Sequence, residues 1–347
     1  MTDKLQTETR SSWQLPAAWR QALPQIIALV AVLFADWLVF PDFFNIRLQD
    51  GRLFGSIVDV FNRGAPVAIL SIGMTLVIAT RGIDLSVGAV MAIAGAVAAT
   101  LINAGHAMPV ALGAALLVGL GCGLWNGLLV AVLDIQPIVA TLILMVAGRG
   151  IAQLITEGQI VTFVDPSLIA VATGDILGIP MPIVITLLML AITVILFRTT
   201  ALGLFIEAIG INRLSSTYAG VNTRIVLTIA YVWCGLTAAM AGVIAAANIK
   251  GADANNAGLW LELDAILAVV IGGTSLFGGR FRLVLSFVGA IIIQAMNTGI
   301  LLSGFKPEFN LIVKAVVIIV ILVTQSDAPR LIYNRYQARK ARTGAAA

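Results

Sequence analysis

Long apolar runs separated by short polar breaks organise almost the whole chain. A bilayer core about 30 Å thick needs roughly 20 apolar residues in one helix, and many of these runs approach that length. We predict ten spans, several of them short enough to be tilted, broken or re-entrant. They cover residues 25–41, 64–80, 85–104, 109–133, 136–156, 180–198, 225–247, 261–278, 283–302 and 309–325. The pattern predicts an all-α polytopic membrane protein with a single transmembrane domain over residues 25–325.

The basic residues divide unequally between alternate loops. If the N-terminus is cytoplasmic, fourteen Lys and Arg residues lie inside and five outside. Because basic loops stay on the cytoplasmic side, this asymmetry and the even number of spans place both termini in the cytoplasm. Tails of residues 1–24 and 326–347 then flank the membrane domain. A composition of 60% hydrophobic and 11% charged residues makes a membrane, and not a nucleic acid, the expected surroundings despite the net charge of +4.

Residues 202–222, LGLFIEAIGINRLSSTYAGVN, form an amphipathic break after the sixth predicted span. We expect two short helices: Gly210 ends the first in a left-handed conformation, Asn212 caps the second, and Gly220 ends it. Glu207, Asn212 and Arg213 should face water or a partner. The apolar members should lie against membrane helices: Leu204, Phe205, Ile209, Leu214 and Tyr218. The pattern fits a cytoplasmic docking surface, and the alternative is an amphipathic loop on the membrane surface.

Polar side chains inside spans are the first candidates for a solute pathway, because they are costly in hydrocarbon unless paired or wetted. Amides offer donors and acceptors without an ionic cost, which suits a neutral, hydroxyl-rich solute. The candidates are Asn126, Gln153, Asp264, Gln294 and Asn297. Each amide could equally join helices to one another. An ion-coupled transporter that uses Asp36 or Asp264 is the alternative.

Two further motifs border the predicted spans. In GIDLSVG, Gly82 to Gly88, Asp84 and Ser86 are placed to cap the third span. In IQPIVATL, Pro137 can open the fifth span, and Gln136 and Thr141 supply polar edges for an inner gate.

Several chemistries have no support in the sequence. Cys122, Cys234 and His106 show no metal-ligand spacing, and no nucleophile with a base is apparent. None of the five lysines follows a glycine, so the Gly-Lys-Ser/Thr ending of a phosphate-binding loop is missing. We therefore expect no catalytic residue, metal or cofactor in this chain, and if ATP drives transport, its energy must come from another polypeptide.

Four stretches resemble the membrane permeases of bacterial ABC importers for ribose, xylose and arabinose. They are GMTLVIATRGIDLSVGAVMAIAGA (73–96), IQPIVATLILMVAGRG (135–150), IEAIGINRLSSTYAGVNT (206–223) and LDAILAVVIGGTSLFGG (263–279). Within this group, IKGADANNAGLWLELDAILAVVIGG (249–273) and AMNTGILLSGFKPE (295–308) are similar to galactofuranose permeases.

The resemblance implies a ten-helix permease with the fold of the vitamin-B12 importer, the type II ABC permease fold, in a bacterial inner membrane. It implies a second permease subunit, a periplasmic sugar-binding protein and a cytoplasmic ATPase that binds ATP and Mg. It assigns residues 202–222 as the segment that couples to the ATPase, with the residues Glu207, Gly210, Asn212, Arg213, Ala219 and Gly220. It makes Gly82, Asp84, Ser86 and Gly88 a family motif.

Overall fold

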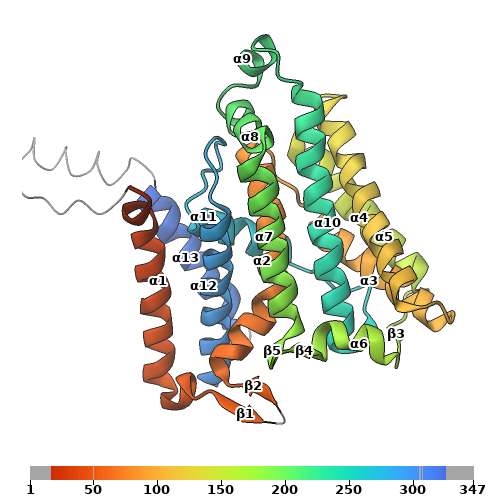
Figure 1. The fold of residues 1–347 in the computed structure, drawn as a ribbon, viewed down its shortest axis with the longest axis vertical. Helices are drawn as coiled ribbons and strands as arrows, with labels where there is room; N and C mark the ends of the chain where they lie inside the picture. Colours follow the sequence, from red (N-terminus) through yellow and green to blue (C-terminus); the bar gives the residue numbers. More distant parts are fainter. Residues whose placement is uncertain (1–16, 50, 305, 307, 326–347) are drawn as a thin grey trace, which may run out of the picture.

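The computed structural model describes residues 17–49, 51–304, 306 and 308–325, and most of them are helical. Figure 1 shows a bundle in which the longest helices stand side by side. Of the expected N-terminal tail, residues 17–24 form the first turns of α1 (Ala17–Val39). The rest of that tail and the expected C-terminal tail lie outside the described residues.

Each of the ten predicted spans coincides with a helix. In chain order these are α1, α2 (Ser56–Ala79), α3 (Val87–Asn103), α4 (Met108–Ala131), α5 (Pro137–Ile155), α7 (Met181–Thr199), α10 (Thr223–Ile249), α11 (Leu261–Ile271), α12 (Leu283–Leu302) and α13 (Phe309–Gln325). Among the described residues, seven helices are long and apolar enough to cross a membrane: α1, α2, α4, α5, α7, α10 and α12. The predicted all-α membrane fold is confirmed at this level.

The other three helices are shorter than a straight span. α3 and α13 have 17 residues each, and α11 has 11. α11 ends at Ile271, well before the predicted end of its span, because the chain turns away through glycines with positive φ at Gly273, Gly278 and Gly279. α2 instead begins at Ser56, before the predicted start at residue 64. Its first two turns carry polar residues, so a search for apolar runs does not include them.

The remaining elements gather at the two ends of the bundle. One end in Figure 1, here called the hairpin end, carries the two-stranded antiparallel pairs β1–β2, β3–β6 and β4–β5. Their bounds are β1 Arg47–Gln49, β2 Arg52–Phe54, β3 Val161–Thr162, β4 Asp175–Ile176, β5 Ile179–Pro180 and β6 Gly251–Ala252. The 3-10 helix η1 (Pro41–Phe44) and α6 (Pro166–Thr173) complete the elements that were not predicted. At the opposite end project α8 (Ala201–Ile211) and α9 (Arg213–Tyr218).

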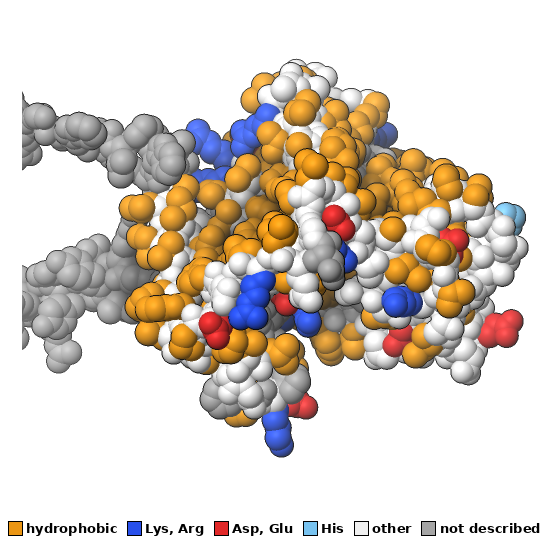
Figure 2. All heavy atoms as spheres, turned by 60° about the horizontal axis from the view of Figure 1, so that its bottom comes forward, with side chains coloured by type: hydrophobic (Ala, Val, Ile, Leu, Met, Phe, Trp, Pro, Cys, Tyr) orange, Lys and Arg blue, Asp and Glu red, His pale blue; other side chains and the backbone are white. Residues whose placement is uncertain are grey.

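The core forms where α10 packs against α2, α3 and α4. Gly119, Gly123 and Gly127 line the face of α4 that meets α10, and a Cβ on any of them would collide with backbone atoms of α10. These glycines let the two backbones approach closely, as small residues do between membrane helices. α1, α4, α5 and α7 instead expose many large apolar side chains, and Figure 2 shows such side chains over much of the visible surface. This outer surface suits lipid.

Candidate functional site

Residues 202–222 fold into two short helices that are capped by side chains. The Thr200 hydroxyl accepts a hydrogen bond from Leu202 N (3.3 Å) at the start of α8. The Asn212 Oδ1 accepts one from Ser215 N (3.0 Å) at the start of α9. Gly220, with φ of 87°, follows the end of α9. The predicted helix pair, the Asn212 cap and the Gly220 turn are therefore confirmed.

The predicted role of Gly210 is wrong. It does not end α8 in a left-handed conformation but lies inside that helix, which continues to Ile211. A Cβ at Gly210 would collide with Ala79 O at the end of α2 and with Gly279 N after α11. These two atoms are joined by a hydrogen bond of 2.9 Å. Gly210 therefore lets α8 lie directly on the place where the end of α2 meets the loop after α11.

Two arginines tie the α8–α9 pair to the bundle. Arg213 forms an ion pair of 2.6 Å with Asp134 in the turn between α4 and α5. Arg81, after α2, donates a hydrogen bond of 2.8 Å to Ile211 O. Since both contacts are exposed, they stabilise little by themselves but fix where the segment lies. A cavity of about 220 Å³ lies between these connections and includes Gln136 in its wall.

The outer face of the α8–α9 pair is apolar, contrary to part of the expectation. Ile209 is buried and Phe205 packs against the bundle, as predicted. Leu204, Leu214 and Tyr218 are instead 68%, 63% and 81% exposed, so they do not lie against membrane helices. Leu204 and Phe205 are neighbours in α8 and so lie about 100° apart around the helix, which prevents both from facing the bundle. Glu207 is half-buried on α8, and Ala219 is exposed after α9.

A buried polar cluster (Asp84, Ser86, Asn126 and Thr141) lies where α3 begins. Asp84 Oδ1 accepts hydrogen bonds from the Ser86 hydroxyl (2.6 Å), Ser86 N (2.9 Å) and Asn126 Nδ2 (3.4 Å). Asn126 Nδ2 also donates to the Ser86 hydroxyl at 2.8 Å. Thr141 accepts from Leu85 N (3.2 Å), which joins α5 to the same break. The structure thus brings together a predicted pathway residue, a predicted gate residue and the family motif.

This geometry corrects the capping prediction. Ser86 is the N-cap of α3, but its side chain makes no capping hydrogen bond, and Asp84 binds Ser86 itself and not the first turn of the helix. Burial raises the pKa of Asp84, and the hydrogen bonds from Ser86 and Asn126 oppose that change. Gly88 lies one turn further on, where a Cβ would collide with Gly258 O, and a Cβ at Gly82 would crowd the Tyr231 hydroxyl. The motif therefore serves packing and a buried polar network, in which Asn126 Oδ1 has no hydrogen-bond partner among the described residues.

Replacing Asp84 with asparagine should keep the acceptor and remove the charge. A raised pKa in the folded protein means that stabilisation is full below the unfolded pKa of about 3.9 and is lost as the pH rises through the folded value. Asp84→Asn should therefore melt with a weaker pH dependence than the wild type above pH 4. Asp84→Ala leaves the Ser86 hydroxyl and Ser86 N without their acceptor and should cost about 1–3 kcal/mol at any pH. Thermal melting of the purified protein in detergent from pH 4 to 8 measures both. Parallel pH profiles for Asp84→Asn and the wild type would contradict the assignment.

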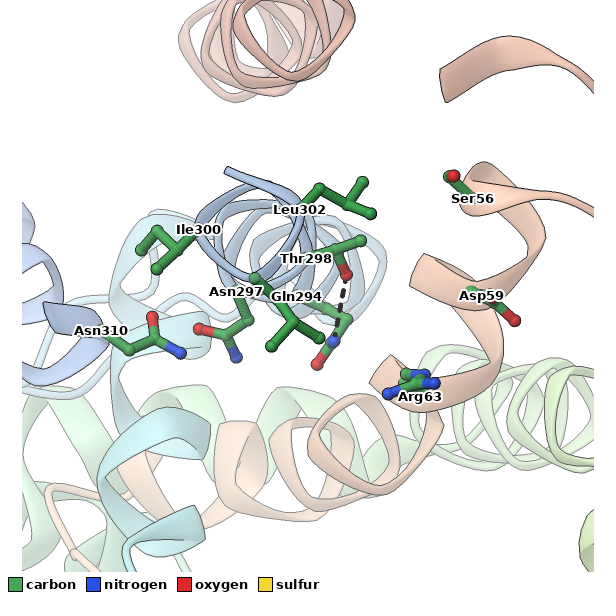
Figure 3. A pocket seen from close by; sticks show the side chains of 10 residues that line it. Ser56, Asp59, Arg63, Gln294, Asn297, Thr298, Ile300, Leu302 and Asn310 are labelled. Carbon is green, nitrogen blue, oxygen red and sulfur yellow. Dashed lines mark hydrogen bonds between the residues drawn. The ribbon is translucent and has the colours of Figure 1, made fainter. Parts of the chain in front are cut away.

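A polar cavity of about 240 Å³ opens near the hairpin end between α2, α12 and α13. Figure 3 shows Asn297 and Asn310 pointing toward each other, with Asp59 and Arg63 of α2 across the space. Gln294 Nε2 donates to the Thr298 hydroxyl at 3.4 Å. The buried Oδ1 atoms of Asn297 and Asn310 have no hydrogen-bond partner among the described residues. Such a lining can meet several hydroxyl groups of one solute.

The other pathway candidates lie elsewhere. Gln153 Nε2, on α5, donates to Asn255 Oδ1 (2.8 Å). Asp264 forms an ion pair of 2.7 Å with Lys314, and both side chains are largely buried. The structure therefore groups Gln294 with Asn297 but separates them from Asn126, Gln153 and Asp264. Asp264 is held by a cation, whereas Asp36 is buried with one oxygen that has no partner among the described residues.

Sequence reasoning selected only Gln294 and Asn297 among the residues that line this cavity. Asp59 and Arg63 stood before the predicted start of their span, and Asn310 was not selected although it lies in the last one. The signal was their spacing: Asp59 and Arg63 lie four residues apart, on one face if the helix extends that far back. Arg149 was not among the candidates either, yet its guanidinium donates hydrogen bonds to two backbone carbonyls.

Apolar helices around a close-packed core, a projecting helix pair and a polar cavity define a multi-pass membrane permease. The family model described as "Branched-chain amino acid transport system / permease component" matches residues 56–322, and the chain belongs to this family.

Three curated proteins are similar over most of their length. The galactofuranose transporter permease protein YtfT of Escherichia coli (strain K12) is 64% identical over 89% of this chain and 91% of its own. The fructose import permease protein FruF of Bifidobacterium longum (strain NCC 2705) is 41% identical over 88% and 87%, and the ribose import permease protein RbsC of E. coli (strain K12) is 36% identical over 89% and 95%. No solved structure matches the chain. The sugar-permease resemblance is confirmed, and the chain is a translocation subunit of a transporter and not an enzyme.

Proposed function

We propose that this chain is the membrane-spanning permease of an ATP-driven importer that carries galactofuranose, or another monosaccharide, into the cytoplasm. The substrate class is supported by the 64% identity to a galactofuranose permease. The observation that carries the mechanism is the α8–α9 pair, which projects from the bundle, exposes Leu204, Leu214 and Tyr218, and rests on the α2 and α11 breaks through Gly210. An ATPase that binds this pair could move those breaks.

The proposed arrangement places ten spans in a bacterial inner membrane, with both termini and the α8–α9 pair in the cytoplasm. α11 and the irregular segments on either side of it form the eighth span. Arg81, Arg198, Arg213, Arg224 and Arg280 then lie on the cytoplasmic side, in keeping with the positive-inside rule. The hairpin end would face a periplasmic sugar-binding protein. A second permease subunit, identical or different, would complete the membrane unit, and two ATPase subunits would bind ATP and Mg.

The proposed path uses both polar regions. The cavity with Gln294 and Asn297 opens near the hairpin end, where solute would arrive. At the other end, Gln136 borders the cavity below α8–α9, and Thr141 joins α5 to the α3 break, which suits a cytoplasmic gate. Alternating access would follow if the ATPase moved the α8–α9 pair, because Arg213 and Arg81 connect it to both sides of that gate.

Glu207→Ala and Asn212→Ala should uncouple ATP hydrolysis from transport. Asn212→Ala removes the cap of α9, typically worth about 1 kcal/mol, which is enough to displace a six-residue helix. Glu207 lies half-exposed on α8, open to a partner. Sugar uptake and ATP hydrolysis are measured in proteoliposomes that contain the permease, ATPase and binding protein. We expect normal permease levels, lower uptake and retained ATPase activity. Normal uptake in both variants would refute the docking role.

A secondary transporter driven by protons is the rival function, and the observation that favours it is the buried oxygen of Asp36 that has no hydrogen-bond partner within the described part of the chain. Asp36 packs against Gly299, where a Cβ would collide with the carboxylate. A buried carboxyl in a span is a functional candidate by default. Asp36→Asn should leave ATP-driven uptake intact if the importer mechanism is correct, whereas a loss of uptake with normal expression would support the rival.

A further inference from the structure

The chain between α10 and α11 is not helical where it passes α3. At the last residue of α3, Asn103 Nδ2 donates to Thr162 O (2.8 Å) on β3, which pairs with β6. A few residues beyond β6, Gly258 packs against Gly88 in the first turn of α3. The segment Asp253–Trp260 therefore passes along much of α3, a helix about 25 Å long at 1.5 Å per residue. In the proposed arrangement α3 spans the membrane, so the N–H and C=O groups of this irregular backbone must pair with protein groups or with water.

Arg149 of α5 supplies some of the hydrogen bonds that this irregular backbone needs. Its Nη1 donates to Ala257 O at 2.6 Å and to Ala254 O at 3.0 Å. One turn further along α5, the hydrogen bond from Gln153 to Asn255 joins the same two elements. The apolar side chains that the segment adds here are short: Ala254 and Ala257 share a cluster with Ala152 and Ile155 of α5 and with Ala92 and Ile93 of α3. Polar bonds, which can be exchanged for bonds to water, therefore hold the segment against α5.

The segment has turning points at its ends and space beside it. Lys250, Gly258 and Trp260 have φ of 55°, 71° and 66°. A cavity of about 250 Å³ lies between the segment, α3 and α10, and Asp253 and Asn256 are in its wall. The segment continues into α11, which packs against α2 and α12. Those two helices carry most of the polar cavity of Figure 3.

We propose that Arg149 is a positioning residue whose hydrogen bonds hold the Asp253–Trp260 segment against α5. These hydrogen bonds break and re-form during each transport cycle. Their breaking lets the segment shift about its left-handed residues and move α11 against α12, which changes the access of solute to the polar cavity. The proposal rests on the proposed function of the chain as a sugar permease.

A reversible cross-link tests the motion. In the complete transporter in proteoliposomes, Gln153→Cys and Asn255→Cys are joined by a short bifunctional methanethiosulfonate reagent that dithiothreitol cleaves. Cross-linking should remove most ATP-driven sugar uptake, and reduction should restore it in the same folded molecules. Each single-cysteine variant, and the wild type with its own Cys122 and Cys234, should keep its uptake after the same treatment. Undiminished uptake by the cross-linked protein would overturn the proposal.

A matched pair controls for cross-linking as such. Asn103→Cys with Thr162→Cys joins α3 to β3 at the hairpin end, a connection that stays closed in the proposed cycle. This cross-link should leave uptake unchanged, and an equal loss in both pairs would overturn the specific role of the Arg149 contact. Absence of ATP-driven uptake in the untreated wild type would instead refute the proposed function. The two failures are therefore distinguishable.

The role of Arg149 itself is tested without transport. Ala254 lies in this segment and is 2% exposed. In an Ala254→Cys background, Arg149→Ala should raise the rate of labelling by a membrane-impermeant thiol reagent several-fold. Arg149→Lys, which keeps a cation and a donor, should bring the rate back toward the parent value. Equal labelling rates in the three proteins would contradict the positioning role.

Discussion

Replacing Gly210 with alanine should reduce ATP-driven uptake roughly 5- to 150-fold, the range that corresponds to about 1–3 kcal/mol of overpacking. The added Cβ would collide with Ala79 O and Gly279 N, which are backbone atoms and cannot swing aside as a flexible side chain could. α8 must then lift away from both breaks, so that movement of the α8–α9 pair no longer reaches them. Uptake is measured in proteoliposomes with saturating ATPase and binding protein.

Gly121→Ala on α4 is the matched control. Gly121 is also a helical glycine, but no atom of another described element lies within 4 Å of the position of its Cβ. Because alanine favours a helix over glycine by about 1 kcal/mol in aqueous helices, this variant should fold and transport at least as well as the wild type. If Gly210→Ala transports as well as Gly121→Ala, close contact at Gly210 has no part in coupling.

Removing Lys314 alone should destabilise the permease by about 3–5 kcal/mol, because it leaves the buried Asp264 carboxylate without its cation. The two groups are 2.7 Å apart, with side-chain exposures of 16% for Lys314 and 9% for Asp264. They join α13 to the half-helix α11. Lys314→Met should therefore lower the melting temperature of the purified protein strongly, and Asp264→Leu should do the same.

The double variant Asp264→Leu with Lys314→Met should recover most of that loss, because apolar residues of similar size often replace a buried ion pair at little cost. An exposed pair provides the comparison. Arg52 and Asp175 are 3.4 Å apart and each about one-third exposed, so Asp175→Asn should change the stability by less than about 1 kcal/mol. A double variant no more stable than the single ones would show that the ion pair itself is required.

The sequence allowed the helical membrane fold and segment 202–222 to be predicted because both follow from local patterns. Asn212 and Gly220 act within a few residues of themselves, so their roles could be predicted correctly. Gly210 could not, because its partners, Ala79 and Gly279, are distant in the chain. The capping prediction for Asp84 was wrong because Asp84 binds Ser86 and not the first turn of α3, and only the contribution of Asn126 comes from a distant part of the chain.

The polar cavity shows the limit of hydropathy. A window that seeks apolar runs excludes Asp59 and Arg63, yet α2 continues through them, and both line the same cavity as Gln294 of α12. The break before α11 was likewise hidden within an apparently ordinary loop. Its importance comes from Arg149, whose partners are backbone carbonyls and leave no trace in side-chain patterns.

Sugar uptake by the reconstituted transporter tests the central account most directly. Proteoliposomes containing this permease, its partner subunits and the ATPase are given labelled galactofuranose and the binding protein outside, with ATP or a non-hydrolysable analogue inside. We predict uptake only with ATP and binding protein together, and no effect of a protonophore at constant ATP. Uptake by this chain without ATP that a protonophore abolishes would contradict the account and favour an ion-coupled transporter.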